Sequence, residues 1–178
     1  MKNKTSLEIE RKWIVKGWPE NNFPLLFTEQ MRQGYISTQP TVRIREENTI
    51  SSTISEKPLQ DNYVLCFKSS GLLTRKEIEM NIPKDKFIEL EDLIGLPLIN
   101  KIRNTYLLPD GHRLEVNHVD EGLDSEFWYA EIEFQTEEEA VHFEPRQIDL
   151  KNYLNNDVTA QPNQSMAAYW RATRCQKY

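Results

Sequence analysis

Isoleucine lies between two residues of like charge at five places in this chain. The acidic triplets are Glu8-Ile9-Glu10, Glu77-Ile78-Glu79 and Glu131-Ile132-Glu133, and the basic ones are Arg43-Ile44-Arg45 and Lys101-Ile102-Arg103. In a β-strand, residues i and i+2 point to the same face, so each triplet places two like charges together and an isoleucine opposite them. One such triplet is typical of a solvated sheet face. Because like charges on one face repel, five of them predict partners from outside the chain: cations for the carboxylates and a polyanion for the Lys and Arg residues.

The acidic pairs have the spacing of a metal site. Two carboxylates on one strand face can jointly hold a hard divalent cation such as Mg²⁺. Lys12 follows Glu8 and Glu10 on the same face and can bind a phosphate oxygen as a point charge. The other polar pairs are Glu131 with Glu133, Glu77 with Glu79 and with Arg75 on the same face, and Glu115 with Asn117.

The basic pairs are the candidates for binding the polyanion. Arginine offers forked donors that match phosphate oxygens, and Arg43, Arg45 and Arg103 have this chemistry, with Lys101 beside the last. Lys68 is isolated in the sequence, and on its own pattern we expect a surface lysine whose stem covers apolar neighbours.

Strand-like stretches must position these side chains. They lie at about 5–15, 28–37, 41–47, 62–70, 74–82, 99–108, 112–119 and 127–135. Asp110-Gly111 between two of them is a hairpin signal. Eight strands joined mostly by short turns predict an α+β chain, mainly antiparallel, whose sheet curls or closes into a barrel with flanking helices. If the sheet closes, the charged groups converge inside it, where ions and water must accompany them.

Helices are predicted between the strands. Pro83 and Gly95 bound a helix at about 84–94. Thr136 to Glu139 form a capping-box pattern that opens a short helix through about Phe143. Further helices are expected near 146–154 and 164–175, and a short one within 16–27. The polar segment 47–62 has no clear period and predicts a loop.

Composition sets the limits. The chain has 178 residues, which predicts one domain over 1–178. A net charge of −6 argues against a nucleic-acid partner. No apolar run approaches the roughly 20 residues of a membrane span, and the first residues lack the apolar core of a signal peptide. Two cysteines, Cys66 and Cys175, give no disulfide framework, so we expect a cytoplasmic protein.

The motifs resemble those of a known family. Glu8, Glu10 and Lys12 form E-x-E-x-K, which resembles the signature of the CYTH superfamily, the triphosphate tunnel metalloenzymes. The resemblance runs over nearly the whole chain. Its further motifs are Gln33-Gly34-Tyr35, Val42-Arg43-Ile44-Arg45, Leu65 to Gly71, Arg75 to Glu79, Lys101-Ile102-Arg103 and Ala130 to Phe134.

The resemblance implies a fold and an activity. It implies an eight-stranded antiparallel tunnel whose charged interior binds a small-molecule triphosphate with Mg²⁺ or Mn²⁺, and it suggests a homodimer. Two departures stand out. Where the family usually has E-x-D, this chain has Glu115-Val116-Asn117, which keeps an oxygen but loses a charge. Where the family often has Tyr-Ser-Asn, residues 162–167 match only loosely.

The resemblance also implies roles for individual residues. The phosphate-binding set is Arg43, Arg45, Lys68, Arg75, Lys101 and Arg103. The catalytic set is Glu8, Glu10, Lys12, Glu131 and Glu133. The metal-binding set is Glu8, Glu10, Glu77, Glu79, Glu115, Glu131 and Glu133.

Three functions remain open at this point. The first is metal-dependent hydrolysis of tripolyphosphate, thiamine triphosphate or a nucleoside triphosphate. The second is a class IV adenylate cyclase, which needs a purine pocket that the sequence does not identify. The third is a polyphosphate-binding module without turnover, for which Asn117 is the sequence hint. The intact E-x-E-x-K motif favours hydrolysis.

Overall fold

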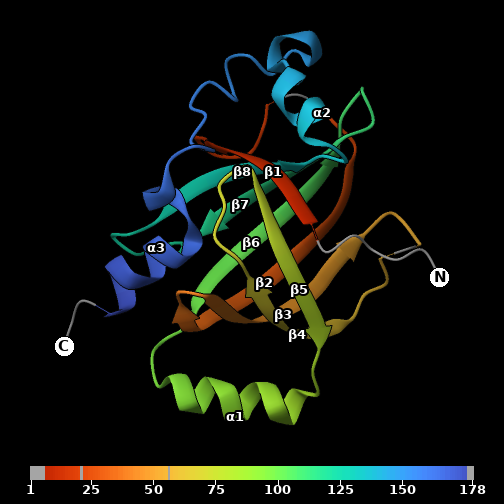
Figure 1. Cartoon of the computed structure of the whole chain (residues 1–178). Coiled ribbons are helices and arrows are strands. Elements are labelled where there is room, and N and C mark those ends of the chain that lie inside the picture. The colour runs from red at the N-terminus through yellow and green to blue at the C-terminus, as the bar shows by residue number, and fades with distance from the viewer. Residues whose placement is uncertain (1–6, 21, 56, 176–178) are drawn as a thin grey trace.

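Eight antiparallel strands close into a barrel in the computed structural model, in the order β1-β5-β4-β3-β2-β6-β7-β8 (Figure 1). The structure describes residues 7–20, 22–55 and 57–175. The strands are β1 (Leu7–Ile14), β2 (Leu25–Thr38), β3 (Thr41–Ser52), β4 (Asp61–Lys68), β5 (Thr74–Asn81), β6 (Ile99–Leu107), β7 (Arg113–Val119) and β8 (Phe127–Glu133). The predicted closed barrel with flanking helices is therefore confirmed.

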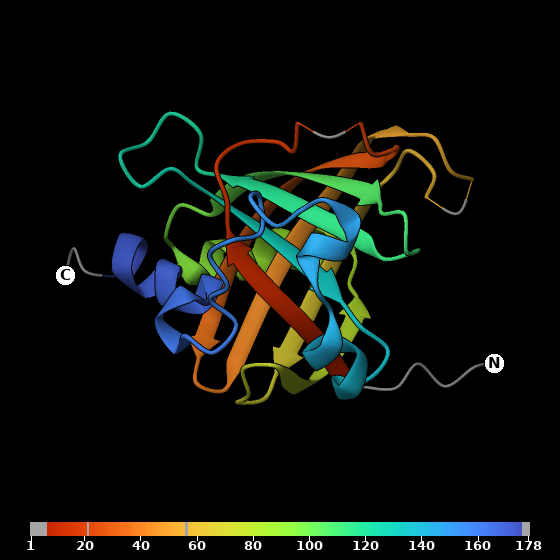
Figure 2. The ribbon, with the colours of Figure 1, turned by 90° about the horizontal axis from the view of Figure 1, so that it is seen from above.

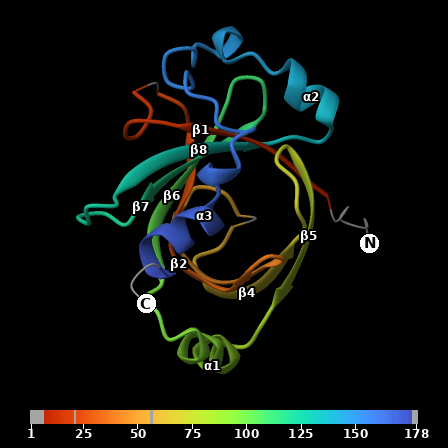
Figure 3. The ribbon, with the colours of Figure 1, turned by 60° about the vertical axis from the view of Figure 1, so that its left-hand side comes forward.

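Short helices flank the barrel. They are α1 (Lys84–Ile94), α2 (Glu137–His142) and α3 (Met166–Trp170), with 3-10 turns at Pro145–Ile148 and Pro162–Gln164 and a π-helix at Arg171–Cys175. Figure 1 and Figure 3 place α1 along the outside of the wall, whereas α3, in blue, lies beside one end of the barrel (Figure 2). Among the described residues, none of the helices combines the length and the apolar character that crossing a membrane would need.

The barrel carries its charges inside and much of its apolar surface outside. Ile9, Ile44 and Ile132, the centres of three triplets, are buried on the outer face. One apolar cluster joins β1, β7 and β8 to the segment that contains α2 and residues 143–154, and a second joins β2, β3 and β4 to α1 and α3. The helices thus replace the central core of an ordinary barrel, which leaves the interior free for polar chemistry.

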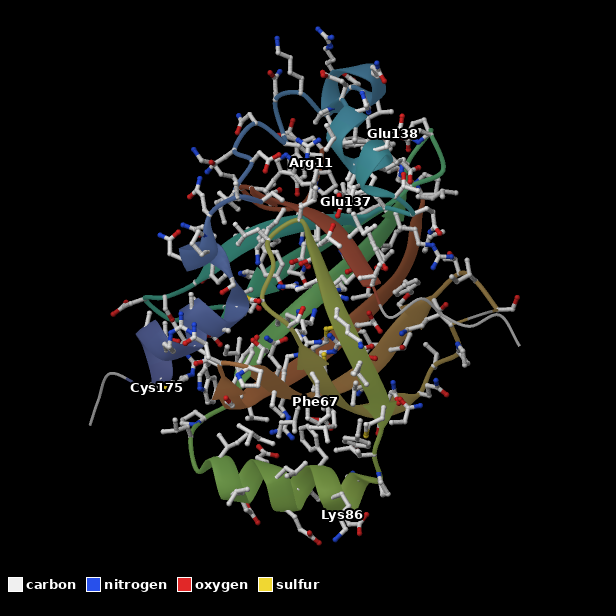
Figure 4. All side chains as sticks on the ribbon, in the orientation of Figure 1. Arg11, Phe67, Lys86, Glu137, Glu138 and Cys175 are labelled. Carbon is white, nitrogen blue, oxygen red and sulfur yellow. The ribbon has the colours of Figure 1, made fainter. Side chains whose placement is uncertain are left out.

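Arg11 ties the C-terminal segment to the outer face of β1. Its guanidinium donates to the carbonyl oxygens of Ala140 at 3.0 Å and Phe143 at 2.8 Å, and it pairs with Asp157. Figure 4 shows Arg11 beneath α2. The other charged side chains of β1 point into the barrel, whereas Arg11 points outward and holds the C-terminal segment in place.

The expected helix at 84–94 has the observed bounds, with Gly95 left-handed at its end. Thr136 accepts a hydrogen bond from the backbone N–H of Glu139, as a capping residue does. The helix expected near 146–154 is only a 3-10 turn, and that near 164–175 divides into α3 and the π-helix. In the described part of 16–27 there is no helix, and residues 5 and 6 of the first predicted strand lie outside the described residues.

The predicted loop at 47–62 was wrong over its first part. Strand β3 continues to Ser52, and Glu47 and Thr49 are buried with their side chains toward the interior. Because this interior is polar, the inward positions of the strand carry no apolar residues. The period-2 pattern of hydrophobicity that reveals an ordinary strand is therefore absent.

Gly34 shows why the second strand contains a glycine. A Cβ built there would lie 2.5 Å from Cδ2 of Leu98, 3.3 Å from Cδ1 of Ile94 and 3.4 Å from Cη2 of Trp170. The glycine therefore lets the end of α1 and helix α3 both pack directly on β2.

We predict that Gly34→Val lowers the free energy of unfolding by about 1–3 kcal/mol, because the side chain overpacks a filled contact. Chemical denaturation measures the change. Gln30→Val, at an exposed position of the same strand, is the matched control and should change stability much less. Equal effects of the two substitutions would contradict the packing role of Gly34.

Candidate functional site

A cavity of about 1630 Å³ occupies the barrel, and all the predicted site residues line it. These are Glu8, Glu10, Lys12, Arg43, Arg45, Lys68, Arg75, Glu77, Glu79, Lys101, Arg103, Glu115, Glu131 and Glu133. They come from seven of the eight strands. Period-2 alternation along each strand aims the charges inward, and closure of the barrel brings them together.

Glu8 lies between two cations. It accepts hydrogen bonds from Nζ of Lys68 at 2.8 Å and from Nε of Arg75. Burial alone would raise the pKa of Glu8, but the positive charges of Lys68 and Arg75 outweigh it and hold the pKa well below its usual range. The expectation that Lys68 alone is a surface lysine was wrong, since its side chain is buried and also pairs with Glu77 at 3.2 Å.

The arginines of β3 converge on the carboxylate of Glu79. Nη2 of Arg43 and Nη2 of Arg45 each lie 3.3 Å from its Oε1. Arg45 also pairs with Glu47 at 2.5 Å. The Nε atoms of both arginines are buried and have no hydrogen-bond partner within the described part of the chain. These arginines therefore retain donor capacity for a further anion.

Lys12 and Arg103 hold Glu131 from two sides. Nζ of Lys12 lies 3.5 Å from its Oε1 and 3.8 Å from the centre of the Tyr129 ring. Arg103 pairs with Glu115 at 2.8 Å, and its Nε donates to Oδ1 of Asn117 at 3.0 Å. The oxygen that Asn117 retains is thus engaged by an arginine.

Lys101 has a different environment from the other cations. It is 3% exposed, and its Nζ hydrogen-bonds the hydroxyl of Tyr129 at 3.1 Å. Lys101 takes part in no ion pair between described residues, whereas Lys12 and Arg103 both pair with Glu131. Burial first, and then the nearby charges of Arg103 and Arg45, lower the pKa of Lys101 well below its usual value. An anion bound beside Lys101 would raise this pKa again and favour the charged ammonium form.

Two carboxyl groups have raised pKa values. Burial, followed by the charges of Glu131 and Glu8, raises the pKa of Glu10 to about 7. Burial also raises the pKa of Glu77 to about 7, helped by hydrogen bonds with Glu8 and Glu79. A carboxyl group with a pKa near neutrality can exchange a proton under physiological conditions.

Glu77 and Glu79 offer oxygen ligands to a divalent cation. One carboxylate oxygen of each and Sγ of Cys66 lie within 4.8 Å of one another. Because burial raises the pKa of the Cys66 thiol to about 12, the thiol stays protonated and the two oxygens are the ligands on offer. Mg²⁺ typically binds one or two carboxylates and completes its shell with water and substrate phosphates. This pair fits that preference.

Two more carboxylate pairs face each other across neighbouring strands. Glu10 lies opposite Glu133, and Glu115 lies opposite Glu131. Like charges directly opposite one another are destabilising. Arg103 offsets this repulsion between Glu115 and Glu131, and Arg75 pairs with Glu10; a bound cation would offset it further. Glu115 is on β7 and is not part of the group formed by Glu77 and Glu79. The predicted metal-binding residues thus line one cavity but fall into separate sets.

The sequence reasoning missed Tyr129, which lines the cavity, and buried acidic residues of the barrel interior that do not line it. Glu47 pairs with Arg45, buried Glu29 pairs with Lys57 at 2.6 Å, and Tyr129 contacts Lys12 and Lys101. Glu47 follows Arg45 at i+2, so continuing the alternation of β3 by one step could have found it. Tyr129 precedes Glu131 at i−2 and could have been found in the same way.

We predict that metal-free wild-type protein loses a contribution to stability as the pH rises from about 4.5 to about 7. The folded-state pKa of Glu10 lies above its unfolded value of 4.5, so the folded state binds the proton more tightly and loses this advantage on deprotonation. Glu10→Gln cannot titrate, and the free energy of unfolding should therefore fall by less over this range, by on the order of 1 kcal/mol. Denaturant titrations in EDTA at pH 5 and pH 7 measure it. Parallel pH dependence in the variant and wild type would refute this, and Glu138→Gln on exposed α2 is the control.

Comparison with known proteins supports the chemistry that the charged cavity indicates. The sequence is 32% identical over 142 residues to a protein of Nitrosomonas europaea named inorganic triphosphatase, which covers 78% of this chain and 83% of that one. The crystal structure of the inorganic triphosphatase NE1496 matches with a TM-score of 0.57 and 25% identity, over 91% of this chain and 93% of that one. The PH1819 protein from Pyrococcus horikoshii OT3 shares the fold, with a TM-score of 0.53 and 22% identity over 80% and 84% of the two chains. No protein-family model matches the sequence.

Proposed function

We propose that this chain, which belongs to the CYTH superfamily of triphosphate tunnel metalloenzymes, hydrolyses inorganic tripolyphosphate with Mg²⁺ or Mn²⁺ inside its barrel. The comparisons favour triphosphate hydrolysis over the cyclisation of ATP, since both the similar sequence and the similar solved structure carry the name inorganic triphosphatase. We also propose a single domain over residues 1–178, a cytoplasmic location and a homodimer, in line with the family resemblance.

The environment of Lys101 carries the proposal. A buried ammonium group without a carboxylate partner is costly unless a ligand balances it. Arg43, Arg45 and Arg103 are buried in the same cavity, and the first two have unused Nε donors. A linear triphosphate has several negative charges and many acceptor oxygens, so it matches this demand better than a singly charged anion does.

In the proposed reaction, a water oxygen attacks the terminal phosphorus of tripolyphosphate. A new P–O bond forms, the bond to the bridging oxygen breaks, and orthophosphate and pyrophosphate leave. The arginines and Lys101 hold the phosphate oxygens and offset negative charge that shifts toward the leaving pyrophosphate.

A carboxylate must receive the proton of the attacking water. Glu10 suits this role, since its pKa of about 7 lets it be ionised at neutral pH and still bind the proton. Lys12 and Glu131 lie on the neighbouring strand positions and would orient the water, with Glu8 held by Lys68 and Arg75 behind them.

The carboxylates that would hold a divalent cation are Glu77 with Glu79, and the facing groups of β7, β8 and β1. Glu8 would add a further oxygen ligand to these sets. When bound, such a cation supplies charge neutralisation on the phosphates and a lower pKa for coordinated water.

A product assay on the purified protein tests the function. We predict that tripolyphosphate gives orthophosphate with Mg²⁺ or Mn²⁺, and that EDTA abolishes the release. Thiamine triphosphate and ATP are offered in parallel, and adenine nucleotides are resolved by chromatography. Cyclic AMP with pyrophosphate from ATP would instead establish a cyclase, and binding without turnover would establish a non-catalytic module.

We predict that Glu131→Gln lowers kcat for tripolyphosphate by about 100-fold, the order of loss expected when a group that positions the reactants is removed. The amide keeps the size of the side chain but loses the charge that pairs with Lys12 and Arg103. Glu138→Gln, on the exposed face of α2, is the control and should keep wild-type kcat. An unfolding midpoint close to that of wild type shows that the fold is intact, and near-normal kcat in Glu131→Gln would refute the role.

A further inference from the structure

The residues that line the cavity reach both ends of the barrel, and we call these two ends its first and second opening. Strand β2 ends at the turn 38–41, which borders the first opening together with residues 158–171. Leu25 at the start of β2 pairs with Tyr106 near the end of β6, so the β6–β7 turn lies at the other end. There it borders the second opening with Glu139 of α2. Figure 1 and Figure 3 agree on this separation of α3 from α2.

The openings differ in charge. Among the cavity-lining residues of 38–41 and 158–171, Arg171 is the only charged one, and most of the others carry hydroxyl or amide groups. The second opening has exposed Arg113 but also Asp110 and Glu139, whose carboxylates lie 3.0 Å and 3.1 Å from the two ring nitrogens of His112. An approaching polyanion therefore meets a cation without carboxylates at the first opening, and a cation together with two carboxylates at the second.

Arg171 has a free side chain on a fixed backbone. Its guanidinium forms no ion pair or hydrogen bond with the residues that the structure describes. The neighbouring positions are anchored, since the hydroxyl of Tyr169 at 2.6 Å and Nη2 of Arg174 at 2.7 Å both donate to Oδ2 of Asp120. Trp170 is 2% exposed and packs against Tyr35.

Asp120 anchors this segment from a buried position. The side chain of Asp120 is fully buried, and it also accepts a hydrogen bond from the backbone N–H of Asn100. At Arg171 the chain changes from α-helix to π-helix, a local geometry that often occurs at functional sites. The fold therefore holds the backbone of Arg171 in place at the rim of the cavity, while its guanidinium stays available to a ligand.

We propose that tripolyphosphate enters through the opening beside α3 and that Arg171 is its first cationic contact there. This inference rests on the proposed function. Arg171 would draw the anion in from solvent, and the buried residues Arg43 and Lys101 would then bind it inside. Charges placed in this way act mainly on association, so their effect depends on ionic strength.

Substitutions that keep, remove or reverse the charge at position 171 test the inference. The series is Arg171→Lys, Arg171→Ala and Arg171→Glu, and the matched control is Arg113→Ala. Arg113 is also exposed and lines the cavity, but at the second opening. Isothermal titration calorimetry with tripolyphosphate in EDTA measures Kd, and phosphate release with Mg²⁺ measures kcat and KM. Circular dichroism confirms folding of each variant.

We expect Lys at position 171 to stay within about twofold of wild type, Ala to weaken Kd and raise KM by about fivefold, and Glu to weaken both further, with kcat little changed. Added salt should reduce these differences. Arg113→Ala should stay within about twofold. A larger loss in Arg113→Ala than in Arg171→Ala, or a series that does not follow charge, overturns the inference.

The calorimetry separates this inference from the proposed function. Binding that follows the charge series without any turnover supports the entrance and refutes the hydrolysis. If the protein turns over tripolyphosphate but Kd and KM do not change along the Arg171 series, only the proposed entrance is refuted. If wild-type protein binds no tripolyphosphate, both proposals fail.

Discussion

The structure depends on one electrostatic constraint, which is that a closed barrel holds many ionised side chains in its interior. Burial disfavours each charge unless a partner is near. The chain satisfies much of this demand itself, because acidic and basic residues lie opposite each other on neighbouring strands at several points, as where Glu8 faces Arg75 and Lys12 faces Glu131. Lys101, which forms no ion pair with a described residue and hydrogen-bonds only the Tyr129 hydroxyl, indicates the kind of ligand that the cavity can bind.

The outer surface follows from the same constraint. Since the barrel interior is polar, the apolar face of each strand must be covered from outside. Helix α1 and the C-terminal segment supply this cover through two clusters around Phe87 and Trp13. The glycine at position 34 allows close packing on β2, and Asp120 fixes the end of the chain beside one opening. The residues that pack outside the barrel are thus needed because its interior is given over to the charged cavity.

Much of the site could be predicted from the sequence, because strand alternation assigns each charged residue to a face and the triplets repeat on different strands. The limits were physical. Glu47 was missed since an inward polar residue in a polar interior gives no hydrophobic period. Lys68 looked like a surface residue because its partners Glu8 and Glu77 lie far away in sequence. The division of the carboxylates into separate sets, and the placement of Arg171 at a rim, depend on closure and on the fold of the C-terminal segment.

The central claim is that the unbalanced interior charges bind a linear triphosphate together with a divalent cation. A crystal structure with Mn²⁺ and a non-hydrolysable tripolyphosphate analogue tests it most directly. The account predicts the analogue inside the barrel, with its oxygens on Arg43, Arg45 and Lys101, and an anomalous Mn²⁺ signal beside cavity carboxylates. An analogue bound only on the outer surface, with no anion and no Mn²⁺ in the cavity, would contradict it.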